Sequence, residues 1–112
     1  MSERKVELKN RGELVEFIKN HKYVMVKVGA SWCGPCKRIQ PYVDELFSKM
    51  PKDVYLVMVD ADEGDIAAAL RVKTLPTFMN FIDGDLQDVY SSGSKDEVLK
   101  FFNSTLSWRN NH

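Results

Sequence analysis

The chain has 112 residues, and its 16 basic and 16 acidic side chains cancel to a formal net charge of zero at pH 7. This balance argues against a nucleic-acid-binding protein, which needs a basic surface, and no apolar run approaches the ~18 residues that span a membrane. The charged N-terminal segment lacks the apolar stretch of a secretory signal. The length and a hydrophobic content of 44% predict one domain over residues 1–112. We expect a cytoplasmic monomer.

Hydrophobic periodicity predicts strands that alternate with helices. Strands are expected at 6–8, 23–28, 54–59, 77–82 and 86–90, and helices at 12–20, after the two cysteines, at 65–71 and at 94–106. The run at 23–28 is almost entirely apolar, which is typical of a strand buried on both faces. Asp83-Gly84 between the last two strands predicts a hairpin. This order indicates an α/β fold with a mixed sheet, and residues 107–112, which lack periodicity, are expected to fray.

The two cysteines of the chain lie in the segment Cys33-Gly34-Pro35-Cys36, between the buried strand and the following helix. At a helix N-terminus, unsatisfied amide groups and the helix dipole favour the Cys33 thiolate. The spacing lets Cys36 come round the first helical turn and close a reversible disulfide. Two unrelated core cysteines are a weaker alternative, because Trp32 and Gly-Pro flank the pair. Zinc is also disfavoured, because it needs four ligands and His21 and His112 lack ligand spacing.

The segment Ala30-Ser31-Trp32-Cys33-Gly34-Pro35-Cys36-Lys37 resembles the active-site segment of the thioredoxins. Leu75-Pro76-Thr77 stands where that family has its cis-proline loop, residues 81–84 resemble the family's hairpin, and Gly93 matches the glycine that faces the active site. The resemblance covers about residues 5–106. It implies the thioredoxin fold, a central mixed β-sheet flanked by helices, with Pro76 in the cis form against the disulfide.

The resemblance also implies a mechanism. The Cys33 thiolate attacks a disulfide in a target protein, and Cys36 resolves the mixed disulfide. The oxidised pair is then recycled by a flavin-dependent reductase or another thiol system, and the protein carries no cofactor or metal of its own. The residues expected to support the active site are Trp32, Gly34, Pro35, Lys27 and Pro76. Those expected to bind the target are Trp32, Leu75, Pro76, Thr77 and Gly93.

One position departs from the family's pattern. Lys27 stands where the family usually has a buried aspartate that aids proton transfer, and Met58 replaces that aspartate's partner lysine. Lysine is seldom buried without a partner. We therefore expect the Lys27 ammonium to reach water at the mouth of the active site; the alternative is an ion pair with an acid that the sequence does not identify. Gly29, where a larger residue is common, should open the space around this strand.

Two functions other than the reduction of target disulfides remain open. The first is a disulfide carrier on the oxidising side, which Lys27 supports because a cation near the pair favours thiolates. The second is a binding module that uses the fold without turnover. Its support is an acidic cluster, which is more simply explained as a solvated rim. The cluster contains Asp60, Asp62, Glu63 and Asp65.

Overall fold

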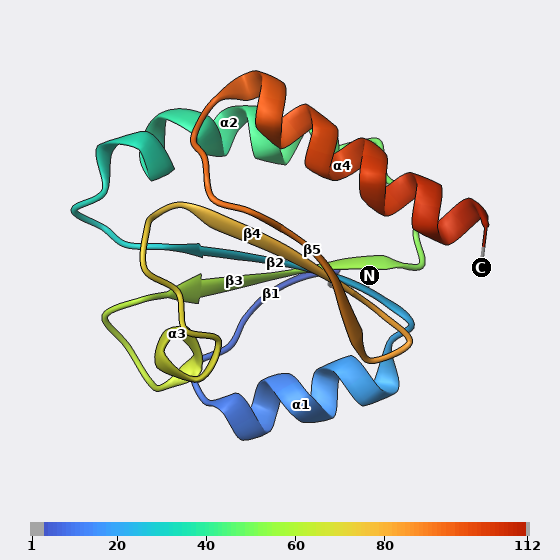
Figure 1. Ribbon diagram of the computed structural model, residues 1–112, viewed down its shortest axis with the longest axis horizontal. Coiled ribbons are helices and arrows are strands. Elements are labelled where there is room, and N and C mark those ends of the chain that lie inside the picture. The colour runs from blue at the N-terminus through green and yellow to red at the C-terminus, as the bar shows by residue number, and fades with distance from the viewer. Residues whose placement is uncertain (1–3, 112) are drawn as a thin grey trace.

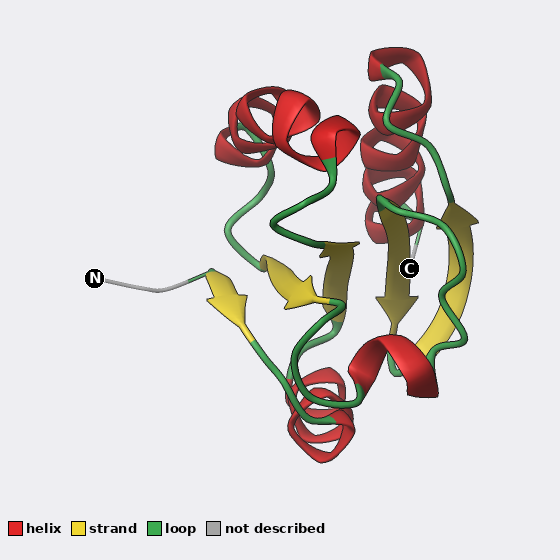
Figure 2. Cartoon of the chain, turned by 90° about the vertical axis from the view of Figure 1, so that its left-hand side faces the viewer, coloured by secondary structure: helices red, strands yellow, loops and turns green. Residues whose placement is uncertain are grey.

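In the computed structural model, which describes residues 4–111, a mixed β-sheet lies between two layers of helices (Figure 1). The elements are β1 (Lys5–Glu7), α1 (Arg11–Asn20), β2 (Tyr23–Gly29), α2 (Gly34–Ser48), β3 (Val54–Asp60), α3 (Ile66–Ala69), β4 (Thr77–Ile82), β5 (Asp85–Tyr90) and α4 (Lys95–Asn110). Helices α2 and α4 cover one face of the sheet, and α1 and α3 cover the other (Figures 1 and 2). Within residues 4–111, no helix combines the length and apolar character needed to cross a membrane.

The described strands have the order β1-β3-β2-β4-β5. β1, β3 and β2 run parallel, whereas β4 is antiparallel to β2 and β5 is antiparallel to β4. The predicted α/β fold with a mixed sheet is therefore confirmed. β2 is central, and its residues alternate between two apolar cores. Val24, Val26 and Val28 face α1 and α3, while Tyr23 and Met25 face α2 and α4.

The predicted hairpin joins β4 and β5. Asp83 and Gly84 both have positive φ angles, 53° and 85°, and Ile82 pairs with Asp85 across the turn. Two consecutive positive φ angles are what a two-residue hairpin turn requires. The predicted helix at 94–106 is also present, and its Ser94 cap accepts a hydrogen bond from the Glu97 amide.

The expected fraying at 107–112 is wrong for the described part of that segment, because α4 continues to Asn110. Trp108 Nε1 donates a 3.0 Å hydrogen bond to Asp88 on β5, and Ser104 on the preceding turn donates to the same carboxylate. Arg109 forms a 2.7 Å ion pair with Asp53. These polar contacts with distant segments, together with the packing of Trp108 against the apolar core, hold the last turns in place. His112 lies outside the described residues.

Candidate active site

Cys33 and Cys36 form a disulfide at the point where β2 leads into α2, with their Cα atoms 5.3 Å apart. Cys33 is the N-cap of α2, and its Sγ accepts a 3.2 Å hydrogen bond from the Cys36 amide. Gly34 and Pro35 are the first helical residues, where proline's missing N–H costs nothing. When the disulfide is reduced, this amide and the helix dipole favour a thiolate on Cys33. The predicted position of the pair at a helix start is confirmed.

The two cysteines border different cavities. Cys33 lines a groove of about 500 Å³ together with Trp32, Pro35 and Leu75. Cys36 instead lines a pocket of about 300 Å³ between the sheet and α2. Both cysteines are buried, and each borders its own cavity.

Trp32 is 68% exposed at the edge of the Cys33 groove. Its Nε1 donates a 2.7 Å hydrogen bond to Asp62. Other carboxylates of the acidic cluster also have partners: Glu63 pairs with Lys9 and Asp65 pairs with Arg11. The sequence analysis missed the Trp32–Asp62 contact because 30 residues separate its two members.

The second wall of the site is the loop before β4. The Leu75–Pro76 peptide bond is cis, as the resemblance implies. The Thr77 side chain is buried, and its hydroxyl donates a 2.6 Å hydrogen bond to the Thr74 carbonyl within this loop. A Cβ on Gly93 would lie 3.1 Å from Pro35 Cβ and 3.6 Å from Pro76 Cδ. The structure therefore brings the loop and Gly93 against the first turn of α2.

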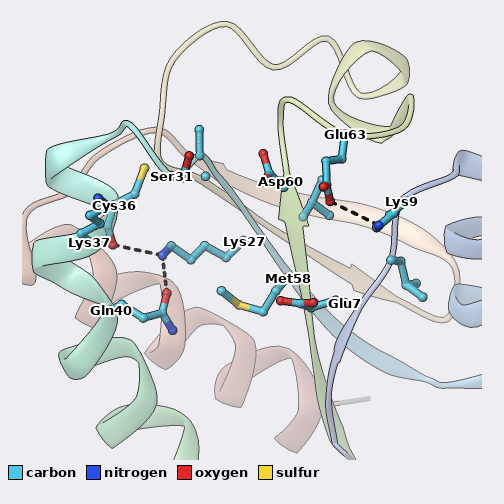
Figure 3. Close-up of a pocket in the computed structure, with 14 residues that line it drawn as sticks. Glu7, Lys9, Lys27, Ser31, Cys36, Lys37, Gln40, Met58, Asp60 and Glu63 are labelled. Atoms are coloured by element: carbon cyan, nitrogen blue, oxygen red, sulfur yellow. Dashed lines mark hydrogen bonds and ion pairs between the residues drawn. The ribbon is translucent and has the colours of Figure 1, made fainter.

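Lys27 lies on the α2 side of β2 and is only 4% exposed. Its Nζ donates hydrogen bonds to the Cys36 carbonyl, at 3.2 Å, and to the side-chain oxygen of Gln40 (Figure 3). Gln40 in turn donates to Asp44, which pairs with Lys5 at 2.8 Å. The expectation that the Lys27 ammonium reaches water at the mouth of the site is wrong, since α2 offers it acceptors beneath the surface. Among residues 4–111, no acid forms a direct ion pair with Lys27, so the alternative is not borne out there either.

Burial lowers the pKa of Lys27 to about 8, because the charged amine loses water; Asp44 opposes this shift and Lys5 adds to it. Gly29 leaves open the space beside this amine. A Cβ at Gly29 would lie 3.4 Å from Cys36 Sγ and 3.9 Å from Lys27 Cε. The sulfur and the end of the lysine stem therefore flank the same small volume.

Gln40 and Asp44 belong to this site, although neither was predicted from the sequence. A signal for them exists, because Gln40 and Asp44 follow Cys36 by four and eight residues and so share its face of α2. Met58 was identified, and it pairs in register with Lys27 on β2 and with Glu7 on β1.

Residues 5–104 match the family model of the thioredoxins. Thioredoxin-2 of Pyricularia oryzae is 39% identical over 82 residues, which are 72% of this chain but 47% of that protein, so the chain spans about half the length of this relative. A thioredoxin H-type protein of Populus jackii is 37% identical over 95 residues, 84% of this chain and 68% of that protein. The oxidised mitochondrial thioredoxin 3 of Saccharomyces cerevisiae has a TM-score of 0.82 and 33% identity, covering 88% of this chain and 93% of that structure.

The mixed sheet and the CxxC disulfide at the start of α2 define a thiol–disulfide oxidoreductase. The family match over nearly the whole length shows that the chain belongs to the thioredoxin family.

Proposed function

We propose that this protein reduces disulfides in target proteins, with Cys33 as the attacking thiol and Cys36 as the resolving thiol. The observation that carries this assignment is the division of the two cysteines between cavities. Cys33 caps α2 and lines the groove beside the exposed Trp32, whereas Cys36 lines the pocket beneath α2. A target disulfide entering the groove meets Cys33 first.

The reaction transfers two electrons from the dithiol to the target. The Cys33 thiolate attacks one sulfur of the target disulfide, and the other target sulfur leaves as a thiolate that takes a proton from water. Cys36 then loses its proton and attacks Cys33 Sγ. The bond between Cys33 and the target breaks, the second target sulfur leaves with the electron pair, and the Cys33–Cys36 disulfide remains.

The target segment binds in an extended form along the groove. Leu75 supplies backbone groups that pair with it, and Trp32 supplies an apolar surface. Pro76 and Thr77 contribute by fixing the shape of the loop, which the Thr77–Thr74 hydrogen bond supports. Gly93 contributes by lacking a side chain next to Pro35.

The protein passes electrons from a recycling enzyme to its targets, and we propose a flavin-dependent reductase or another thiol system as that donor. The cytoplasm is a suitable compartment, because cellular thiols are kept reduced there. A monomer suits the role, since the Cys33 groove must stay open to many targets.

Insulin reduction in the presence of dithiothreitol tests this function. The wild-type protein should accelerate precipitation of the insulin B chain, and Cys33→Ser should not. A Cys36→Ser variant should capture targets as mixed disulfides on Cys33, and Cys33→Ser is its matched control. Wild-type activity equal to that of Cys33→Ser would refute the proposal and favour a binding module.

A disulfide carrier on the oxidising side is the second candidate, and the buried Lys27 favours it. A cation next to Cys36 stabilises the thiolate and therefore the reduced form. Equilibration with glutathione buffers decides between the two directions. A Cys33–Cys36 pair that glutathione reduces readily would identify a carrier, whereas a pair that stays oxidised would identify a reductant.

A further inference from the structure

The resolving step requires Cys36 to lose a proton while it is buried. Cys36 is 3% exposed and lines only the pocket beneath α2, not the groove where the target binds. A thiol is a poor nucleophile, and the thiolate is the reactive form. The proton must therefore pass to a group that faces this pocket, or to water within it.

The charged groups that face the pocket and Lys27 come from three elements and the adjoining loops. Lys37 and Asp44 lie on α2, Lys5 and Glu7 on β1, Lys9 just after β1, Asp60 at the end of β3 and Glu63 beyond it. The carboxylates among them are engaged or exposed. Asp44 pairs with Lys5, Glu63 with Lys9, and Asp60 accepts a hydrogen bond from the Asp62 amide. Glu7 is exposed to solvent.

Lys27 differs from these groups in burial and contact. Apart from Cys36 itself, it is the one buried ionisable side chain among the described residues that line the pocket, and its Nζ donates a hydrogen bond to the Cys36 carbonyl (Figure 3). The open volume beside Gly29 connects the lysine stem to Cys36 Sγ. We propose that Lys27 is the proton acceptor for Cys36 in the resolving step, so that an amine drives the release of the target. This inference rests on the proposed function.

In the mixed disulfide, neutral Lys27 takes the proton from the Cys36 thiol and becomes an ammonium ion. The Cys36 thiolate attacks Cys33 Sγ, the bond from Cys33 to the target sulfur breaks, and that sulfur leaves as a thiolate with the electron pair. The Lys27 ammonium then gives its proton to water in the pocket. The target disulfide is the oxidant, and no further reactant is needed.

The titration of Lys27 suits this role. With its pKa lowered to about 8 by burial, roughly a tenth of the molecules carry a neutral amine at pH 7, against almost none for an exposed lysine. Amines whose pKa is tuned close to the working pH are effective general bases. The resolving step should therefore accelerate with pH through a midpoint near 8.

A bis(nitrobenzoate) disulfide resolves the two steps in one experiment, because each step releases one coloured thiolate. Mixed with equimolar reduced protein in a stopped-flow instrument, it should give a first phase from Cys33 and a second from Cys36. Lys27→Met should slow the second phase by about tenfold or more at pH 7 and leave the first within about twofold. A second phase unchanged in Lys27→Met would overturn the inference. If the wild-type protein showed neither phase, the proposed function itself would be overturned.

Lys27→Arg separates a proton acceptor from a fixed charge. Arginine keeps the positive charge and can donate hydrogen bonds, but it stays protonated and cannot accept a proton. We expect Lys27→Arg to be as slow in the second phase as Lys27→Met, whereas a wild-type rate would overturn the inference. Lys9→Met removes an exposed charge at the same pocket and is the matched control. Asp60→Asn tests the rival carboxylate, and a tenfold slower second phase there would also overturn the inference.

An NMR titration tests the same proton exchange without any Lys27 variant, so its result does not depend on whether such a variant folds. Groups that exchange a proton titrate as a coupled pair. In the reduced protein, the NMR signal of Lys27 Cε should titrate with a midpoint that moves when Cys36 is replaced by alanine. The same midpoint in the wild-type protein and in Cys36→Ala would refute the exchange.

Discussion

Replacing Lys27 with methionine should stabilise the oxidised protein at pH 7. The pKa of this amine is lowered from 10.5 to about 8, chiefly by burial, which at 1.36 kcal/mol per pKa unit bounds the cost of its charge at about 3 kcal/mol. Because the pocket opens to solvent, we discount this cost to about 2 kcal/mol. Methionine loses the hydrogen bonds to Gln40 and to the Cys36 carbonyl, which at about 0.5 kcal/mol each are together worth about 1 kcal/mol. The expected gain in the free energy of unfolding is therefore about 1 kcal/mol.

The gain in the free energy of unfolding from Lys27→Met should decrease as the pH rises. Below pH 8 the amine is charged in both the folded and the unfolded state, so the folded wild-type protein bears the full cost. Between pH 8 and 10.5 the folded state has released its proton while the unfolded state still holds it. The wild-type protein therefore gains stability relative to Lys27→Met across this interval. At pH 10 most of this cost is gone, so we expect Lys27→Met to be the less stable protein by about 0.5 kcal/mol.

Urea unfolding of both oxidised proteins at several values between pH 6 and 10 measures the difference, since the disulfide keeps the thiols from titrating. Subtraction cancels the titration of all other groups. Lys9→Met is the control, because it removes an exposed amine that lines the same pocket. The reasoning would be refuted if Lys27→Met were less stable than the wild-type protein at pH 7 by an amount that stays constant to pH 10. Burial would then carry no free-energy cost for the charged amine of Lys27.

Three further outcomes follow from the geometry. In the reduced protein at pH 7, iodoacetamide should label Cys33 many times faster than Cys36, as peptide mass spectrometry would show; equal labelling would contradict the roles of the cysteines. Gly93→Ala places a Cβ 3.1 Å from Pro35 and should lower kcat/KM for insulin reduction about fivefold without lowering Tm; wild-type kcat/KM would exclude close packing there. Asp88→Ala removes an acceptor shared by Trp108 and Ser104 and should cost about 2–3 kcal/mol in urea unfolding, whereas Ser107→Ala, at an exposed position, should cost little.

The fold could be predicted from the sequence where local and global preferences agree. The apolar run of β2 is needed on both faces of the sheet, and Asp83-Gly84 can adopt the positive φ angles of the hairpin. The end of α4 could not be predicted in this way. Its last turns are held by Trp108 and Arg109 through partners on β5 and just before β3. Such contacts join residues far apart in the chain and leave no periodic pattern.

The candidate active site could likewise be predicted only in part. The position of Cys33 and Cys36 follows from a local rule about helix N-termini, and the structure has that arrangement. The direction of the Lys27 side chain follows no local rule. A long, flexible stem can carry its charge to water or turn to any acceptor within reach. Here the acceptors are the Cys36 carbonyl and Gln40, both on α2, the helix that covers this face of β2.

The two cavities give the two sulfurs opposite surroundings, and this difference explains how one disulfide can serve two steps. Cys33 lies at a helix N-terminus that stabilises its thiolate continuously, which suits a group that must attack whichever target arrives. Cys36 lies beside an amine whose charge depends on pH. Its reactivity is therefore conditional, since the amine must first be neutral to take the proton. A permanent cation at position 27 would favour the reduced pair at every pH, but it could not regulate the release of the target. A proton acceptor at position 27 therefore gives the resolving step a dependence on pH that the initial attack does not share.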